Sequence, residues 1–350
     1  DQKSEGCRIL PQPCKRRTMI IHLRPDISEQ EAHRFAAMTT SAIFYDGQRF
    51  VLVTPSKLKE VPAEIEPHAE AHWAMDSDIQ LASRSYSAPT RTIQLGQQSI
   101  GGDTNNTMVI AGPCSVESEE QIRQSADLMK ELGIQGLRGG CYKPRTSPYS
   151  FQGLGREGLR LLAKMREEHG FVIVSEVRDA THVDDVIEFA DVIQIGAKSM
   201  YDHGILKACS KSDKAVLIKR GFGTTLQEFV QAAEFVLSGG NSNVMLCERG
   251  IRTFETKTRF TLDLCGVAWL KEHINLPIIL DPSHALGYRY GIEDLSKACV
   301  AMGIDGLLVE VHPDPSVAKS DAAQQLYHDQ FRHLLKAIKP VAQAVGRNIV

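Results

Sequence analysis

Four side chains that commonly bind transition metals lie far apart in the sequence. Three follow short apolar runs and the fourth opens the last predicted helix: Cys114, His284, Glu310 and Asp321. One thiol, one imidazole and two carboxylates suit a single divalent ion of Mn, Fe, Co or Zn better than Mg or Ca. A structural zinc site would favour closed, cysteine-rich ligation, so this set predicts an open, catalytic site. His312, two residues after Glu310, is a competing ligand or a partner of one.

A second group of side chains is cationic. Arg138, Lys143 and Arg145 fall within eight residues, among glycines and prolines. Further cations follow other apolar runs: Lys198, Lys219 and Arg249. Arginine suits bidentate binding of phosphate or carboxylate, and lysine supplies a point charge or a proton. Arg145 and Thr146 lie further along their loop, so the cations predict two phosphorylated substrates, one held by this pair.

These residues are carried by a regular alternation of elements. Eight short apolar runs alternate with amphipathic, helix-like segments. The runs are TMVIAGPC (107–114), QGLRGG (135–140), FVIVSEV (171–177), DVIQIGAK (191–198), AVLIKRG (215–221), NVMLCERG (243–250), LPIILDPSH (276–284) and DGLLVEVHP (305–313). Apolar strands separated by helices indicate a parallel sheet covered on both faces. Eight units over about 245 residues predict a (β/α)8 barrel. A doubly wound open sheet is the alternative, but eight units overfill an ordinary one.

A barrel would bring the polar side chains together. They lie at or just past the C-terminal ends of the runs: Cys114, Arg138, Glu176, Gln194, Lys198, Lys219, Arg220, Glu248, Arg249, Asp281, His284, Glu310 and His312. In a barrel these ends converge on one face, where active sites are built, and the first, seventh and eighth strands are neighbours. Any one of these residues can be a satisfied strand-end group. Burying all of them together at one end of the barrel would cost a large desolvation free energy unless ligands bind them, which indicates an anionic substrate and a metal.

The chain divides into four segments. Residues 1–18 are interpreted as a flexible extension or an expression remnant. Residues 19–85 predict a small α+β domain of the ferredoxin-like type, with helices at 28–38 and, more weakly, at 64–75. Residues 86–106 are a linker and hairpin that would plug the barrel's N-terminal end, and 107–350 form the barrel. Nothing in the small domain looks catalytic, and His68 with His72 is at best a weak metal pair.

Composition excludes several other classes of protein. A net charge of −3 and a pI near 6.5 over 350 residues argue against nucleic-acid binding. No apolar run is long enough to span a membrane, and the first residues lack the apolar core of a secretory signal. Eight cysteines at irregular spacing indicate reduced thiols, so we expect a cytoplasmic protein.

Six motifs then identify a family. They are IAGPCSVES (110–118), LRGGCYKPRTSPYSFQGLG (137–155), LIKRGFGTT (217–225), LCERGIRTFE (246–255), DPSHALG (281–287) and VEVHPDPSVAKSD (309–321). Their order resembles 3-deoxy-D-arabino-heptulosonate 7-phosphate (DAHP) synthase, in its short microbial form with an N-terminal ferredoxin-like domain. The resemblance implies condensation of phosphoenolpyruvate with erythrose 4-phosphate, the entry to the shikimate pathway. It also implies a homotetramer and a regulatory role for the small domain, through binding of an aromatic amino acid.

The resemblance assigns roles to individual residues. It implies that the metal is held by Cys114, His284, Glu310 and Asp321. It implies that phosphoenolpyruvate is bound by Arg138, Lys143, Lys219, Arg249 and the backbone around Ala197. Arg145 and Thr146 would take the aldose phosphate; the related synthase of the eight-carbon acid KDO has a Lys-Ala-Asn-Arg-like loop instead. The catalytic candidates are Lys143 as proton donor to the developing alkoxide, Glu176 as the group that positions water, and Asp281. Glu176 has an alternative role as a salt-bridge partner of Arg138 or Lys219.

The sequence departs from the family's usual residues at two places. Lys198 replaces the family's usual arginine, which keeps the charge but loses the planar fork and predicts weaker phosphate binding. Leu286 and Tyr288 replace smaller residues near the expected metal, which leaves room for a modified substrate preference.

Two rival functions stay open. One rival is a Schiff-base aldolase with Lys219 as nucleophile. The other is a non-enzymatic, partner-binding barrel in which residues 19–85 carry the function.

Overall fold

The computed structural model describes residues 18–350, apart from 56, 57, 59, 144–146 and 148. The chain forms two compact units, one ending at Gln80 and one running from Leu81 to Val350. Each has its own sheet and its own buried core. The domain limits inferred from the sequence stay predictions, and residues 1–17 lie outside the described part of the chain.

The larger unit is a closed parallel barrel, as predicted. Its strands are β7 (Asn106–Gly112), β8 (Gly136–Arg138), β9 (Val172–Val177), β10 (Val192–Ile195), β11 (Ala215–Lys219), β12 (Val244–Glu248), β13 (Ile278–Leu280) and β14 (Gly306–Glu310). Each pairs in parallel with the next, and β14 pairs with β7 to close the sheet. Each strand falls within one of the eight apolar runs, or begins one residue before it. The open-sheet alternative is therefore wrong.

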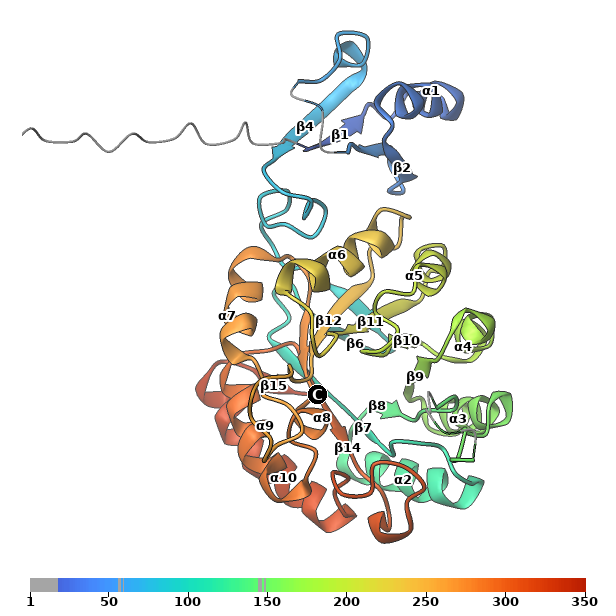
Figure 1. Cartoon of the computed structure of the whole chain (residues 1–350), viewed down its shortest axis with the longest axis vertical. Coiled ribbons are helices and arrows are strands. Elements are labelled where there is room, and N and C mark those ends of the chain that lie inside the picture. Colours follow the sequence, from blue (N-terminus) through green and yellow to red (C-terminus); the bar gives the residue numbers. More distant parts are fainter. Residues whose placement is uncertain (1–17, 56–57, 59, 144–146, 148) are drawn as a thin grey trace, which may run out of the picture. The chain divides into compact units, whose positions relative to one another are not determined.

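Helices surround the barrel on its outer side (Figure 1). They are α2 (Glu119–Leu132), α3 (Arg156–His169), α4 (Val183–Phe189), α5 (His203–Ser210), α6 (Leu226–Leu237), α7 (Leu264–His273), α9 (Ile292–Ala301) and α10 (His328–Ala344). In α2 the Ser118 side chain caps the first turn, and Gly133 ends the helix with a left-handed φ of 71°. Within the described ranges, no helix is both long and apolar enough to cross a bilayer.

A hairpin and the C-terminus close the N-terminal end of the barrel. The hairpin pairs β5 (Ile93–Leu95) with β6 (Gln98–Ile100), and Ile93, Leu95 and Ile100 belong to the same buried cluster as the barrel's inward-facing side chains. The strand β15 (Asn348–Ile349) pairs with the start of β7. Apolar packing fills this end, as predicted for the hairpin, and the opposite, C-terminal end is the face on which barrels build active sites.

The smaller unit contains a four-stranded antiparallel sheet with the order β2-β3-β1-β4. Its elements are β1 (Thr18–Leu23), α1 (Glu29–Thr39), β2 (Ala42–Tyr45), β3 (Phe50–Val53), the 3-10 turn η1 (Glu66–His68) and β4 (Ala69–Met75). Phe35 of α1 packs with Ile21 and Leu52 in the buried core. This strand order, with one helix after the first strand, confirms the ferredoxin-like α+β prediction.

The weaker helix predicted at 64–75 is wrong. Only η1 is helical there, and residues 69–75 form the strand β4, whose side chains alternate between partly buried and exposed. Alternation with a period of two fits a strand with one covered face better than a helix. His68 and His72 therefore do not share a helical face, and the weak metal pair proposed for them loses its basis.

Candidate active site

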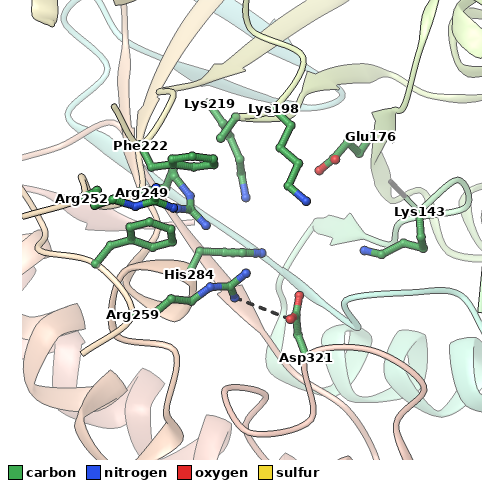
Figure 2. Close-up of a pocket in the computed structure, with 12 residues that line it drawn as sticks. Lys143, Glu176, Lys198, Lys219, Phe222, Arg249, Arg252, Arg259, His284 and Asp321 are labelled. Carbon is green, nitrogen blue, oxygen red and sulfur yellow. Dashed lines mark ion pairs between the residues drawn. The ribbon is translucent and has the colours of Figure 1, made fainter. Parts of the chain in front are cut away.

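A cavity of about 310 Å³ opens among the loops that follow the barrel strands, and half of the residues that line it are lysines or arginines (Figure 2). Six positively charged side chains line it: Lys143, Lys198, Lys219, Arg249, Arg252 and Arg259. Two carboxylates, Glu176 and Asp321, face the same space, together with His284 and the residue Ala197. An excess of cations over acids in a small cavity fits a multiply charged anion.

Three of the four predicted metal ligands form one group. The thiol of Cys114 and one carboxylate oxygen each of Glu310 and Asp321 all lie within 4.8 Å of one another. The Sγ of Cys114 is 3.3 Å from Oδ2 of Asp321. His284 adjoins the group, because its Nε2 is 3.4 Å from Oε1 of Glu310. The four side chains are therefore brought together, as the sequence predicts.

The barrel register explains why Cys114 and Glu310 meet. Glu310, the last residue of β14, pairs with Gly112, the last residue of β7, and Cys114 follows two residues later. Gly112 has a φ of 143°, and a Cβ there would lie 2.3 Å from the carbonyl oxygen of Arg138. Only glycine lets the chain pass this close to β8 as it turns into the site.

His284 is held by its neighbour on a short helix. The helix α8 (Pro282–Leu286) begins directly after β13, with Asp281 as its cap. Asp281 accepts hydrogen bonds from the backbone N–H of His284 at 3.0 Å and from Nδ1 at 2.7 Å. A proton on Nδ1 leaves Nε2, the nitrogen nearer Glu310, with its lone pair free for a metal.

Asp321 does not open the last helix, and this part of the prediction is wrong. The helix α10 begins at His328, and Asp321 lies in the preceding loop with a φ of 47°. Asparagine and aspartate adopt this left-handed conformation more readily than most residues. The loop therefore turns its carboxylate toward Cys114, while Arg259 pairs with the other oxygen at 3.6 Å.

Charges within the group set its protonation. Burial and the nearby Glu310 carboxylate raise the pKa of the Cys114 thiol to about 12, despite the opposing effect of Lys143. Burial also opposes ionisation of Asp321, but His284 and Arg259 outweigh it and lower the pKa of Asp321 to about 2. His284 and Arg138 likewise keep the pKa of Glu310 below its usual value against burial. The acids are thus ionised, and the thiol keeps its proton until a cation displaces it.

Buried cations surround this group. Lys143 donates to the Sγ of Cys114 at 3.1 Å, and Lys219 pairs with Asp281 at 2.6 Å. Arg138 pairs with Glu310 and is not part of the described cavity lining, so it lies behind Glu310 as seen from the cavity. Arg249 is 5% exposed and lies over the Phe260 ring at 4.5 Å. Its Nη1 has no hydrogen-bond partner within the described chain, which points to an anionic ligand.

Glu176 faces the cavity from the end region of β9. Its Oε2 accepts a hydrogen bond from Gln194 at 2.5 Å. Among the ion pairs of the described residues Glu176 forms none, so the salt bridge to Arg138 or Lys219 is not what holds it. A Cβ on Gly196 would lie 2.5 Å from its Oε1, so the absence of a side chain at 196 leaves room for the carboxylate.

Some strand-end polar residues have structural roles. Arg220 pairs with Glu248 at 3.0 Å and with Asp263 at 2.8 Å, which ties the loop after β12 to β11. His312 accepts a hydrogen bond from the backbone of Asp314 at 3.0 Å and does not belong to the group formed by Cys114, Glu310 and Asp321. Tyr288 is 46% exposed and stacks on Tyr290.

Sequence reasoning missed part of the cavity wall. Arg252 and Arg259 line it, and Arg252 lies over the Phe222 ring (Figure 2). The Phe222 ring stacks on Phe260. The available signal was the loop between β12 and α7, because a concentration of positive charge in one loop favours binding of an anion. That loop carries four cations: Arg249, Arg252, Lys257 and Arg259. Arg145 and Thr146 lie outside the described residues.

Comparison with known proteins agrees with this geometry. The model of the DAHP synthetase I family matches residues 87–346. A phospho-2-dehydro-3-deoxyheptonate aldolase of Thermotoga maritima is 44% identical over 266 residues, covering 76% of this chain and 78% of that protein. A 2-dehydro-3-deoxyphosphooctonate aldolase of Syntrophotalea carbinolica is 33% identical, covering 73% of this chain and 98% of that protein.

Solved structures give the same result. The crystal structure of the Thermotoga maritima phospho-2-dehydro-3-deoxyheptonate aldolase (DAHP synthase) superposes with a TM-score of 0.76 at 36% identity. That alignment covers 95% of this chain and 99% of the other. A truncated form of the 3-deoxy-D-arabino-heptulosonate 7-phosphate synthase from the same organism gives 0.73 at 39% identity, covering 78% of this chain and 100% of the other.

Proposed function

This chain belongs to the DAHP synthetase I family, and from that premise we propose that it condenses phosphoenolpyruvate with erythrose 4-phosphate and water. The products are DAHP and inorganic phosphate, at the first step of the shikimate pathway toward aromatic amino acids. One observation carries the proposal: a cavity lined by six cations adjoins a group of one thiol and two carboxylates, with an imidazole beside it.

The group fits a divalent transition metal. Cys114, His284, Glu310 and Asp321 offer a mixed set of sulfur, nitrogen and oxygen donors, and the three atoms already within 4.8 Å need little movement to share an ion. Mn, Fe, Co and Zn all suit this set. When bound, such an ion supplies Lewis acidity toward the carbonyl oxygen of the aldose.

Phosphoenolpyruvate binds among the cations on the other side of the cavity. Lys198, Lys219, Arg249 and the backbone at Ala197 are the proposed phosphate ligands, with Lys143 toward the carboxylate. Arg138 pairs with Glu310 and does not line the described cavity, so its proposed contribution is positive charge from behind that acid. The unpaired Nη1 of Arg249 supports this assignment, because a buried N–H donor without an acceptor is costly unless a ligand provides one. The enol then attacks the aldehyde through C3.

Two protein groups handle protons and water. Lys143 lies 3.1 Å from the Cys114 thiol, and Cys114 and Glu176 keep its pKa above the usual value despite burial. Its ammonium can therefore donate a proton to the alkoxide that forms from the aldehyde. Glu176 orients the water that adds at C2, after which phosphate leaves. Asp281 acts as a positioning residue, because it fixes both Lys219 and His284.

The aldose phosphate is proposed to lie against Arg145 and Thr146. Phosphoenolpyruvate contributes three carbons, so a four-carbon aldose gives the seven-carbon acid and a five-carbon aldose gives the eight-carbon one. The higher identity to the heptonate aldolase than to the octonate aldolase supports the four-carbon substrate.

The Schiff-base alternative is disfavoured by one contact. Lys219 is ion-paired with Asp281 at 2.6 Å, and a protonated amine cannot attack a carbonyl carbon.

Residues 19–85 are proposed as a regulatory domain that binds an aromatic amino acid, and the protein is proposed to form a homotetramer.

A phosphate-release assay tests the function. We expect phosphoenolpyruvate and erythrose 4-phosphate to give one phosphate per DAHP, and a five-carbon aldose phosphate to react at least tenfold more slowly. Phenylalanine and tyrosine are added in parallel to test the small domain. Equal rates with both aldoses would contradict the assigned substrate, and no release with either, in the presence of Mn, would contradict the function.

A further inference from the structure

Gln324 lies in the loop between β14 and α10 and contacts the metal-binding group from outside. Its side chain is almost completely buried, at 2% exposure. Its Nε2 donates to Oε2 of Glu310 at 2.7 Å, and its Oε1 accepts from Nη1 of Arg259 at 2.8 Å. Neither Gln324 nor Arg259 was singled out by the sequence analysis, and Gln324 does not line the described cavity.

The two hydrogen bonds fix the amide in one orientation. A guanidinium can only donate, so the amide oxygen must face Arg259 and the NH₂ must face Glu310. One oxygen of Glu310 is thereby occupied. The other, Oε1, faces Arg138 and lies 3.4 Å from Nε2 of His284.

Arg259 also reaches the second acid. The same Nη1 lies 3.6 Å from Oδ1 of Asp321, and Figure 2 shows this pair across the edge of the cavity. The backbone N–H of Gln324 donates to the carbonyl of Asp321 at 3.2 Å. A chain of contacts therefore runs from Asp321 through Arg259 and Gln324 to Glu310.

We propose that Gln324, oriented by Arg259, is a positioning residue that holds Glu310 and Asp321 in the arrangement required for metal binding. The inference rests on the proposed metal-dependent function. Groups that hydrogen-bond to metal ligands typically contribute 10- to 100-fold to metal affinity. The competing explanation is that Gln324 only satisfies a buried carboxylate and stabilises the fold.

Mn²⁺ binding to the full-length protein, without substrates, separates the two explanations. Free Mn²⁺ is followed by electron paramagnetic resonance, and the unfolding midpoint of the metal-free protein is measured alongside. We expect Gln324→Met to raise the Kd for Mn²⁺ 10- to 100-fold. The matched control is Gln121→Met, because Gln121 is also buried, at 7%, but its side chain bonds, among the described residues, only to the backbone of Ser115 and Glu117. It should leave the Kd within twofold.

A double-mutant cycle tests the role of Arg259. If Arg259 orients the amide, Gln324→Met should weaken Mn²⁺ binding less in an Arg259→Met background than in the wild type. Fully additive effects would refute the orienting role. A Gln324→Met Kd within twofold of wild type, or an equal loss in Gln121→Met, would overturn the proposal while leaving the proposed function intact.

Two further outcomes are decisive. If Gln324→Met does not fold, Arg259→Met alone carries the test, because its side chain is 40% exposed. Loss of positioning predicts weaker Mn²⁺ binding, whereas simple removal of a neighbouring positive charge predicts tighter binding through reduced repulsion. Tighter binding would overturn the proposal. Absence of Mn²⁺ binding in the wild type would overturn both the inference and the metal-dependent function.

Discussion

Gly196→Ala should displace the Glu176 carboxylate without replacing it. The added Cβ would lie 2.5 Å from Oε1 and 2.8 Å from the carboxyl carbon of Glu176. Gly196 does not have a left-handed φ, so alanine is compatible with its backbone. The clash is with the end of a flexible side chain, and the carboxylate can therefore retreat at little cost to the fold.

The size of the effect follows from that distance. An ordinary van der Waals contact begins at about 3.4 Å, so Oε1 must move by roughly 0.9 Å from its 2.5 Å contact. Such a shift stretches or breaks the 2.5 Å hydrogen bond from Gln194. A misplacement of about 1 Å in a catalytic group can lower the rate about 100-fold, equivalent to about 2.7 kcal/mol. We therefore expect kcat to fall 30- to 100-fold while KM for the aldose phosphate changes little.

Steady-state phosphate release at saturating substrates measures the effect. Gly223→Ala is the control, since a Cβ there meets no atom within 4 Å, and it should keep full activity. Adding Gly196→Ala to Glu176→Ala should cost nothing more, because the group that clashes is gone. A kcat within twofold of wild type for Gly196→Ala would refute the role of Glu176. If Gly196→Ala lowers kcat by the same factor in the Glu176→Ala background as in the wild type, Gly196 acts through another contact.

Four other predictions probe the rest of the site. Exhaustive chelation should abolish phosphate release and Mn²⁺ should restore it, and activity that survives chelation refutes the metal role. Burial raises the pKa of the Cys114 thiol to about 12, so the thiol is protonated at neutral pH and Mn²⁺ binding should release about one proton. Titration calorimetry in buffers of different ionisation enthalpy counts the protons released. A count of zero would show that the thiolate is not a ligand. Arg145→Ala should raise KM for erythrose 4-phosphate at least tenfold more than KM for phosphoenolpyruvate, and equal effects would break the assignment of the two phosphates. Lys198→Arg should lower KM for phosphoenolpyruvate severalfold by restoring a bidentate fork, and a higher KM would contradict that reasoning.

Barrel periodicity made most of the site predictable from the sequence. Cys114, His284 and Glu310 each lie at or just past the end of a predicted strand, and a closed barrel has to bring the first, seventh and eighth strand ends together. The hairpin at 93–100 was also predictable from the sequence, because short segments with apolar residues flank a turn that contains glycine.

Long loops were less predictable. Asp321 was assigned to a helix, although the loop continues to His328, because its position depends on contacts with Arg259 and Cys114 rather than on local propensity. The strand β4 was assigned to a helix because alanine and glutamate favour helices locally, whereas pairing with β1 decides the outcome. Gln324 carries no sequence signal of its own, since its role exists only once Glu310 and Arg259 lie on either side of it.

A crystal soaked with Mn²⁺ and phosphoenolpyruvate would test the central claim most directly. The account predicts one anomalous peak within bonding distance of Cys114 Sγ, His284 Nε2 and carboxylate oxygens of Glu310 and Asp321, with the phosphate of phosphoenolpyruvate against Arg249. A peak bonded to none of these four side chains, or a phosphate bound away from Arg249, would contradict it.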